Sequence, residues 1–419
     1  MATLNSWPWR RVKTLAAVLA GSLLLNLTVN TAAHADEPVP ASTRNVIFVG
    51  NNWEGMIDVI DATTYENIGR ISGIPDKAER MREIRGNFLR FILFYGIRYL
   101  VGEGHDQYVD DMYSSKDGRL LIVSRPSFAD VVAIDIASGD IVWRFQVKGY
   151  RSDHMAISPD GTEVAVSAST GKVVHILNVE TGVERGQFPS GNSPHENVYS
   201  KDGKRIFHAS IGHVFTPFDS DSLASLKGVR IFKIVDAETL QDIKSFDLKP
   251  KLKEVGLGHL SPAIRPMAHT ADERFFYFQL SFLHGFIEYD MVEDKVSRLA
   301  ELPNLIPDVP VTKYINDSAH HGIALSGDET TFCVAGTMDD YVALVDRETF
   351  TYNILTGLGE KPYWVTSNAA GDHCYISWSG TDQMSVISYA TVTEVARVDV
   401  GYHPQRIREG AIPADWAGH

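Results

Sequence analysis

Seven pairs of adjacent residues carry side chains that can do chemistry, and each pair stands at the start of a short apolar run. Their groups are imidazole, carboxylate, guanidinium, phenol and indole. Independent solvated residues would not collect at equivalent positions, so the set favours a functional site over a series of wall or turn residues. The pairs are Asp110-Asp111, Asp153-His154, His195-Glu196, Arg265-Pro266, His320-His321, Tyr363-Trp364 and Gln405-Arg406.

One chemistry that these pairs could support is metal binding. Imidazole suits Zn, Cu and Mn, and a carboxylate from Glu196 or Asp111 would add oxygen. No H-x-x-x-H or H-E-x-x-H spacing is present, so the fold would have to bring distant ligands together. The predicted ligands of a divalent transition metal are His154, His195, His320 and His321.

The same groups could instead act as general acid and base, because imidazole titrates near neutral pH. The predicted catalytic residues are His154, His195, Glu196, Asp111 and His321. Arg265 and Arg406 would hold an anionic small molecule, and Tyr363, Trp364 and Trp53 would stack on a ring. There is no nucleophile elbow, P-loop, C-x-x-C-H or dinucleotide fingerprint, so we expect neither haem nor a nucleotide cofactor.

A repeat of about 42 residues must position these pairs. Polar turns such as Ser115–Gly118, Ser158–Gly161 and Ser200–Gly203 recur, and Asp and Gly suit such turns. A second phrase follows each turn by about 20 residues, as in Asp236-Ala237-Glu238-Thr239. Four short strands in each repeat of this length are typical of a propeller blade.

Residues 152–182 closely resemble the phrase of the YVTN-type β-propeller repeat family, and residues 319–349 and 362–390 resemble it moderately. This resemblance implies an all-β fold and says little about activity. Seven inner strands predict a single seven-bladed β-propeller over 44–410. Its first strands would pair with the segment near Pro404 to close the ring, leaving 411–419 as a tail.

The remaining length falls in loops that share one face of the predicted propeller. These loops include a partly helical insertion at 72–108. Within it, 80–101 is aromatic and has helical spacing. We expect this segment to pack on the rim, to cover the channel, or to contact a protein partner or a membrane. Cys333 and Cys374 are predicted to point to opposite pleat faces, which argues against a disulfide.

The N-terminus has the pattern of a secretory signal at 1–35, followed by a linker at 36–43. Arg10, Arg11 and Lys13 precede an apolar stretch that ends at Ala33-His34-Ala35. This predicts a secreted or periplasmic protein with no membrane span after processing. The net charge of −14 argues against nucleic-acid binding.

These features predict a propeller that acts on a small molecule in its channel, as a lyase or hydrolase with or without a metal. The alternative is a non-catalytic extracellular binding or redox-partner propeller. The residues do not decide between the two.

Overall fold

The computed structural model describes residues 42–217 and 219–418. The expected signal at 1–35 and most of the linker at 36–43 lie outside the described residues. Hydrogen-bonded turns connect the two strands of most of the hairpins. In Ser158–Gly161 the Ser158 hydroxyl donates to Asp160 at 2.5 Å, and Gly161 has φ +74°. In Asp236–Thr239 the Asp236 carboxylate accepts the Thr239 amide at 2.7 Å. Such turns favour antiparallel hairpins of short strands.

The described strands form seven four-stranded antiparallel sheets, which confirms the seven-bladed β-propeller. By sheet, they are β28 (Pro404–Pro413), β1 (Thr43–Asn51), β2 (Met56–Asp61) and β3 (Asn67–Ser72); β4 (Asp111–Ser114), β5 (Leu120–Arg125), β6 (Asp130–Asp135) and β7 (Ile141–Gln146); β8 (Ser152–Ile157), β9 (Glu163–Ala168), β10 (Val173–Asn178) and β11 (Glu184–Pro189); β12 (Pro194–Tyr199), β13 (Arg205–Ser210), β14 (Phe232–Asp236) and β15 (Asp242–Phe246); β16 (Ile264–His269), β17 (Phe275–Leu280), β18 (Gly285–Asp290) and β19 (Lys295–Glu301); β20 (Ile323–Leu325), β21 (Thr331–Gly336), β22 (Tyr341–Asp346) and β23 (Tyr352–Thr356); and β24 (Pro362–Ser367), β25 (His373–Trp378), β26 (Gln383–Ser388) and β27 (Thr393–Asp399).

The ring is closed by a sheet built from both ends of the described chain. β28 pairs with β1 in antiparallel register, from Thr43 opposite Pro413 to Asn51 opposite Pro404. β28 therefore continues three residues beyond the predicted domain end at 410. The predicted tail is also held in place, because the Trp416 indole donates to the Ile136 carbonyl at 3.0 Å. These pairings leave no open edge on β1.

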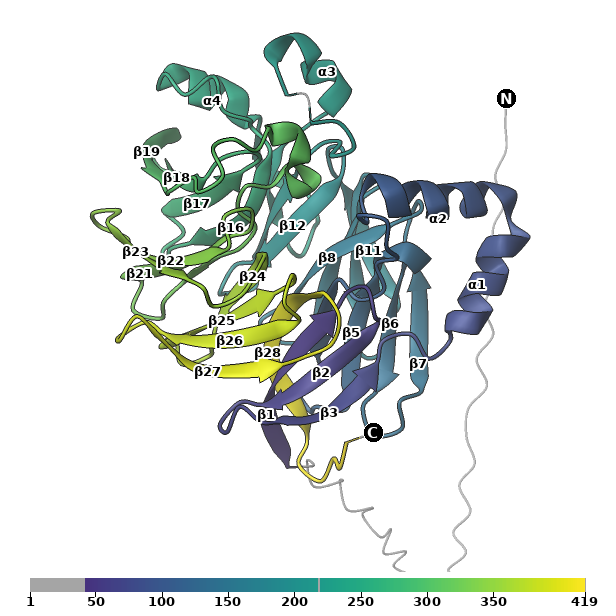
Figure 1. Ribbon diagram of the computed structural model, residues 1–419. Coiled ribbons are helices and arrows are strands. Elements are labelled where there is room, and N and C mark those ends of the chain that lie inside the picture. Colours follow the sequence, from purple (N-terminus) through teal and green to yellow (C-terminus); the bar gives the residue numbers. More distant parts are fainter. Residues whose placement is uncertain (1–41, 218, 419) are drawn as a thin grey trace, which may run out of the picture. The chain divides into compact units, whose positions relative to one another are not determined.

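The inner strand of each sheet contacts the inner strands of its two neighbours around the whole ring. The order is β28, β4, β8, β12, β16, β20, β24 and back to β28. Apolar side chains fill the space between neighbouring sheets, and Val386 of β26 packs with Ile407 of β28 in this way. Figure 1 shows the sheets arranged around a centre, with the helices outside them.

Among the described residues, helices lie in the loops between sheets or between second and third strands, where the sequence predicted insertions. They are α1 (Lys77–Gly86) and α2 (Phe88–Leu100) before β4, α3 (Ala224–Lys227) between β13 and β14, and α4 (Leu248–Glu254) before β16. The helical segment expected at 80–101 is thus two helices, and Asn87 caps the second by accepting the Arg90 amide. Within the described range, no helix is both long and apolar enough to cross a bilayer.

The structure contains a disulfide between Cys333 and Cys374, so the prediction against it was wrong. Cys333 lies on β21 and Cys374 on β25, in neighbouring sheets, with Cα atoms 6.5 Å apart. Neighbouring sheets of a propeller present opposite pleat faces to each other. Opposite orientation therefore brings the two sulfurs together, into one apolar cluster with Val342 and Ile376.

Candidate functional site

Irregular pairing at the start of three inner strands turns predicted site residues toward the channel. The register of β8 with β9 shifts between Ser152 and Met155, which leaves 153–154 out of the ladder. Similar shifts leave out 195–196 on β12 and 265–266 on β16. A bulge redirects side chains that regular alternation would send to opposite faces.

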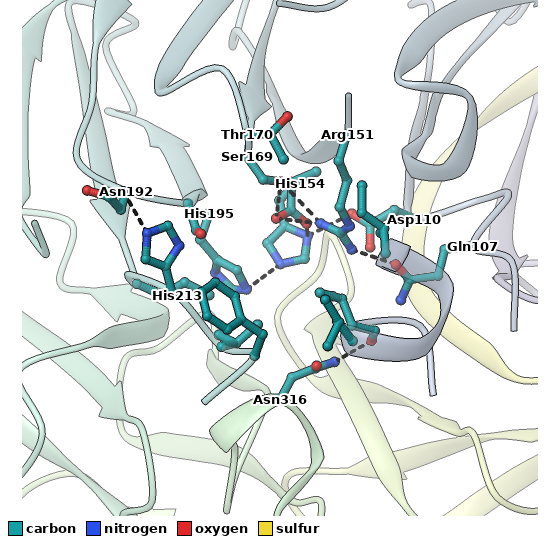
Figure 2. A pocket seen from close by; sticks show the side chains of 18 of the residues that line it. Gln107, Asp110, Arg151, His154, Ser169, Thr170, Asn192, His195, His213 and Asn316 are labelled. Carbon is teal, nitrogen blue, oxygen red and sulfur yellow. Dashed lines mark hydrogen bonds and ion pairs between the residues drawn. The ribbon is translucent and has the colours of Figure 1, made fainter. Parts of the chain in front are cut away.

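Three histidines from three different sheets meet in the channel. Nε2 of His154 lies 2.8 Å from Nε2 of His195, and the two rings meet edge to face. Ring nitrogens of His154, His195 and His321 all lie within 4.8 Å of one another. Figure 2 shows His154 and His195 pointing toward each other beneath Ser169 and Thr170.

A carboxylate orients one of these rings. Nδ1 of His154 is hydrogen-bonded to Asp110 at 2.8 Å, which leaves Nε2 to face the other two imidazoles. A carboxylate behind a histidine fixes its tautomer and increases its basicity as a metal ligand. Asp153 completes a second group with Asp110 and His154, again within 4.8 Å.

All three imidazoles are held in the neutral form. Burial lowers the pKa of His154 well below its ordinary value, and the nearby Arg406 guanidinium lowers it further. Burial likewise lowers the pKa of His195 and of His321. Neutral imidazole is the form that binds metal ions. The three residues therefore fit a divalent transition metal in type, protonation and proximity.

The acidic groups nearby show the reverse shift. Burial raises the pKa of Asp110, and it raises the pKa of Asp153 to about 6. Arginine side chains act against this effect, since Arg151 lies 3.0 Å from the Asp153 carboxylate. A cation bound by the histidines would favour the ionised form of both carboxyls.

A cavity of about 280 Å³ lies above the histidines. Ile97, Leu100 and Val101 at the end of α2 form part of its apolar wall, and Val214 and Phe215 form another part. We expected the 80–101 segment to pack on the rim, to cover the channel or to contact a partner. The position of this end of α2 fits the second of these expectations. The cavity thus combines an apolar wall with a polar floor, as in many small-molecule sites.

Cationic groups line the same cavity. They are Arg151, Lys172 and Arg265. The Arg265 side chain donates to the Ser281 hydroxyl at 3.0 Å and to the Asn316 carbonyl. Tyr363 also lines the cavity, so both Arg265 and Tyr363 lie where a channel ligand would be.

Asp111 does not join the histidines. Its two carboxylate oxygens accept two hydrogen bonds from Arg408, each 2.9 Å long, and it also accepts the Met155 amide. Asp111 is wholly buried and its acceptor positions are taken. We interpret it as a structural ion-pair partner, and its neighbour Asp110 faces the site instead.

Glu196, Trp364 and Arg406 lie deeper in the channel. Glu196 and Trp364 line a second cavity of about 440 Å³ that shares no residue with the first. Arg406 stacks on the Trp364 indole at 3.3 Å, and its Nη2 lies 3.8 Å from Glu196. Burial raises the pKa of Glu196 to about 7. These groups separate the two cavities, so the structure does not place Glu196 beside His195 in one chamber.

Two further predicted residues lie away from the histidine trio. Trp53 is stacked between His105 and His403, with ring centres 3.8 and 3.5 Å away, so both of its faces are covered. His320 points away from His321 and joins His284 and Asp339. Adjacent residues of an extended chain face opposite ways, which explains the separation.

Several cavity residues were missed by the sequence predictions of the site. Asp110 and Asp153 belong to the predicted pairs, but the sequence analysis assigned the site role to their neighbours Asp111 and His154. Arg151 lines the cavity from just before the inner strand β8, and His213 lines it from the loop after β13. The bulge at 153–154, which the sequence pattern does not reveal, lets both Asp153 and His154 face the cavity. Asp110 lies just before β4, where the sequence pattern does not show which of the two aspartates faces inward.

Fold and site together define a seven-bladed β-propeller with a histidine-lined channel. No protein-family model matches the sequence, and no curated protein matches it either. Among solved structures it is similar to Kuenenia stuttgartiensis hydrazine synthase, at 13% identity and a TM-score of 0.53. The match covers 74% of this chain and 96% of that chain. This likeness supports the propeller fold alone, and the YVTN resemblance stays a prediction.

Proposed function

We propose that this protein is a secreted or periplasmic propeller that binds a divalent transition metal through His154, His195 and His321 and acts on a small molecule above it. One observation carries the proposal. Three buried, neutral imidazoles from separate blades converge beneath a cavity, with Asp110 behind one of them. Such a site leaves a position open toward the cavity, as catalytic zinc sites do.

Features of the cavity support a small organic anion as the substrate. Its volume of about 280 Å³ suits a small molecule. Arg151 is paired with Asp153 in the same cavity, so the cations left for a ligand are Arg265 and Lys172. Together with the apolar wall they favour an organic anion, which these two side chains would orient. A bound metal would supply Lewis acidity and lower the pKa of a coordinated water. Lyase or hydrolase chemistry fits this set of groups.

Metal analysis of the purified mature protein tests the proposal. We expect stoichiometric Zn, Cu or Mn in the wild type and the loss of one equivalent in His154→Ala and His195→Ala. Asp110→Asn should weaken metal affinity by about 10- to 100-fold, because it removes the orienting carboxylate. His373→Ala is the matched control, since His373 lies on β25 and bonds to Asp372 outside the channel.

Two results would count against the metal site. One is a metal-free wild type that stays metal-free after incubation with these ions. The other is a metal content that His154→Ala leaves unchanged. If the metal is absent but the histidine variants abolish turnover of a small anionic substrate, the general acid–base mechanism would be favoured instead.

A second candidate function is non-catalytic binding through α2. Phe88, Leu89, Ile92 and Tyr99 of this helix are 79%, 53%, 48% and 72% exposed, an unusual set for a soluble surface. Helices α1 and α2 carry six Lys and Arg against two Glu, although the whole chain is acidic. The partner would therefore be a protein with an acidic, partly apolar surface.

Substitutions at the exposed end of α2 separate this function from chemistry in the channel. Phe88→Ser with Ile92→Ser changes no residue that lines the cavity. If binding is the function, these variants should lose an acidic partner that cross-links to wild-type α2, while metal content stays the same. An identical cross-linking pattern in wild type and variant would exclude this surface.

A further inference from the structure

A second cluster of metal-ligand residues lies outside the channel cavity. His284 follows β17, His320 precedes β20, and Asp339 lies in the turn between β21 and β22. Nδ1 of His284 is 2.6 Å from Asp339 Oδ2, and Nε2 of His320 is 3.3 Å from the same oxygen. Donor atoms of all three residues lie within 4.8 Å of one another.

The surroundings orient Asp339 and His284 toward the cluster, and the Tyr341 hydroxyl lies 3.2 Å from Nε2 of His320. The second oxygen of Asp339 accepts the Leu305 amide at 2.8 Å, so Oδ2 is the one that faces the histidines. Nε2 of His284 is hydrogen-bonded to the Tyr314 hydroxyl at 2.7 Å, which leaves Nδ1 for the cluster. An outer hydrogen bond of this kind is usual behind metal-binding histidines.

The cluster is closed. His320 and Asp339 are buried, and the His284 side chain is 11% exposed. None of the three lines the channel cavity described above. Two imidazoles and one carboxylate make three protein ligands, the number that catalytic zinc sites use. The burial of this cluster and its lack of access to the channel cavity, rather than its ligand set, favour a structural ion.

We propose that His284, His320 and Asp339 form a second, structural site for a divalent transition metal, with Zn²⁺ as the best-suited ion. This site is separate from the proposed centre at His154, and neither depends on the other being occupied. A network of hydrogen bonds without an ion is the competing explanation, and the experiment below distinguishes the two.

An ion here would anchor the loop at 302–322 that forms one wall of the channel cavity. Tyr314 and Leu305 of this loop contact the cluster. A few residues along, Asn316 lines the cavity and its carbonyl accepts a hydrogen bond from Arg265. Asp317 forms an ion pair with the buried Lys227. The second ion would thus fix the loop that holds Arg265 in place.

Zinc content and zinc titration of single-site variants test this inference. After chelation and reloading with Zn²⁺ alone, we expect two Zn²⁺ per chain in the wild type and one in His284→Ala. Asp339→Asn, which keeps the shape of the side chain, should also bind one, so the test does not rest on His284→Ala folding. Tyr314→Phe should weaken one of the two sites by about tenfold or more, and His373→Ala should leave both unchanged.

The two sites fail in distinguishable ways. A single Zn²⁺ lost only in His284→Ala and Asp339→Asn would support the second site and contradict the channel site. A single Zn²⁺ lost only in His154→Ala, or no bound Zn²⁺ at all, would overturn the second site. Amide hydrogen exchange at 304–317, which excludes the channel ligand His321, provides an independent readout: removing Zn²⁺ should accelerate exchange there in the wild type and in His154→Ala, but not in His284→Ala. Unchanged exchange in the wild type would contradict the anchoring role.

Discussion

At the scale of single residues, adjacent side chains in the channel have different roles. Asp110 orients His154, whereas Asp111 pairs with Arg408. His321 joins the channel trio, whereas His320 joins Asp339. The pairs could be located from the sequence because the turns set the phase of every inner strand. Which member faces the cavity could not, because it depends on bulges and on where each strand begins.

The assignment of Asp111 as a structural residue makes a testable prediction. Arg408→Met would leave the Asp111 carboxylate buried without its cation, and breaking a buried ion pair in this way typically costs about 3–5 kcal/mol. Urea unfolding monitored by fluorescence should show a free energy of unfolding lower by that amount, with an unchanged m value. Metal content at the channel site should remain that of the wild type.

The double variant Asp111→Asn with Arg408→Met is the control. It removes the unpaired charge as well as its partner, so it should recover part of the lost stability. If Arg408→Met is as stable as the wild type, or if it loses metal while remaining folded, Asp111 belongs to the functional site after all.

At the scale of elements, the Cys333–Cys374 disulfide links two sheets that are neighbours in the ring. It joins β21 to β25 and closes a segment of 41 residues. The sequence predicted the position of each cysteine on its strand. It also predicted that the two side chains point to opposite pleat faces, and this orientation is compatible with the bond. The error lay in treating the two sheets as if they presented the same face to each other.

Removing this link should lower stability without changing the fold. Cys333→Ala with Cys374→Ala relaxes a constraint on the unfolded chain, and a loop of this size corresponds to about 2–4 kcal/mol. Chemical denaturation of the oxidised wild type, the reduced wild type and the double variant measures this effect. Reduction and substitution should shift the midpoint in the same direction. Equal midpoints for all three would show that the bond contributes nothing to stability.

At the scale of the whole molecule, the described chain forms one ring closed by β28 and β1. The repeat period made seven blades and their closure predictable, because each blade repeats the same turn chemistry. The insertions were predictable only as extra length on one face. How α2 and the 302–322 loop wall the cavity depends on long-range contacts such as the one from Asn316 to the Val101 carbonyl.

A closed ring should respond to acid as a unit, and one buried histidine outside the proposed metal sites allows this to be tested. His208 on β13 is wholly buried and bonds to Ser190 and Asn197. Burial lowers its pKa to about 3, and the hydrogen bond to the Glu196 carbonyl acts in the opposite direction. The unfolded chain therefore takes up a proton near pH 6.5 that the folded chain refuses until about pH 3. Stability from this group is present above pH 6.5 and is lost as the pH falls.

The turn carboxylates should extend this loss to lower pH. Burial raises the pKa of Asp61, but the Thr64 and Thr63 amides and the Arg44 side chain outweigh it and bring it to about 2. We expect His208→Gln to remove about 1.4 kcal/mol per pH unit from the pH dependence of unfolding between pH 6 and 4. The loss between pH 4 and 2 should remain. Urea unfolding at each pH, with chelator present so that metal release does not contribute, measures both slopes. If the slope above pH 4 is unchanged in His208→Gln, a group other than His208 is responsible for it. The ring unfolds as one unit, so every group whose pKa differs between the folded and unfolded chain contributes to the same transition.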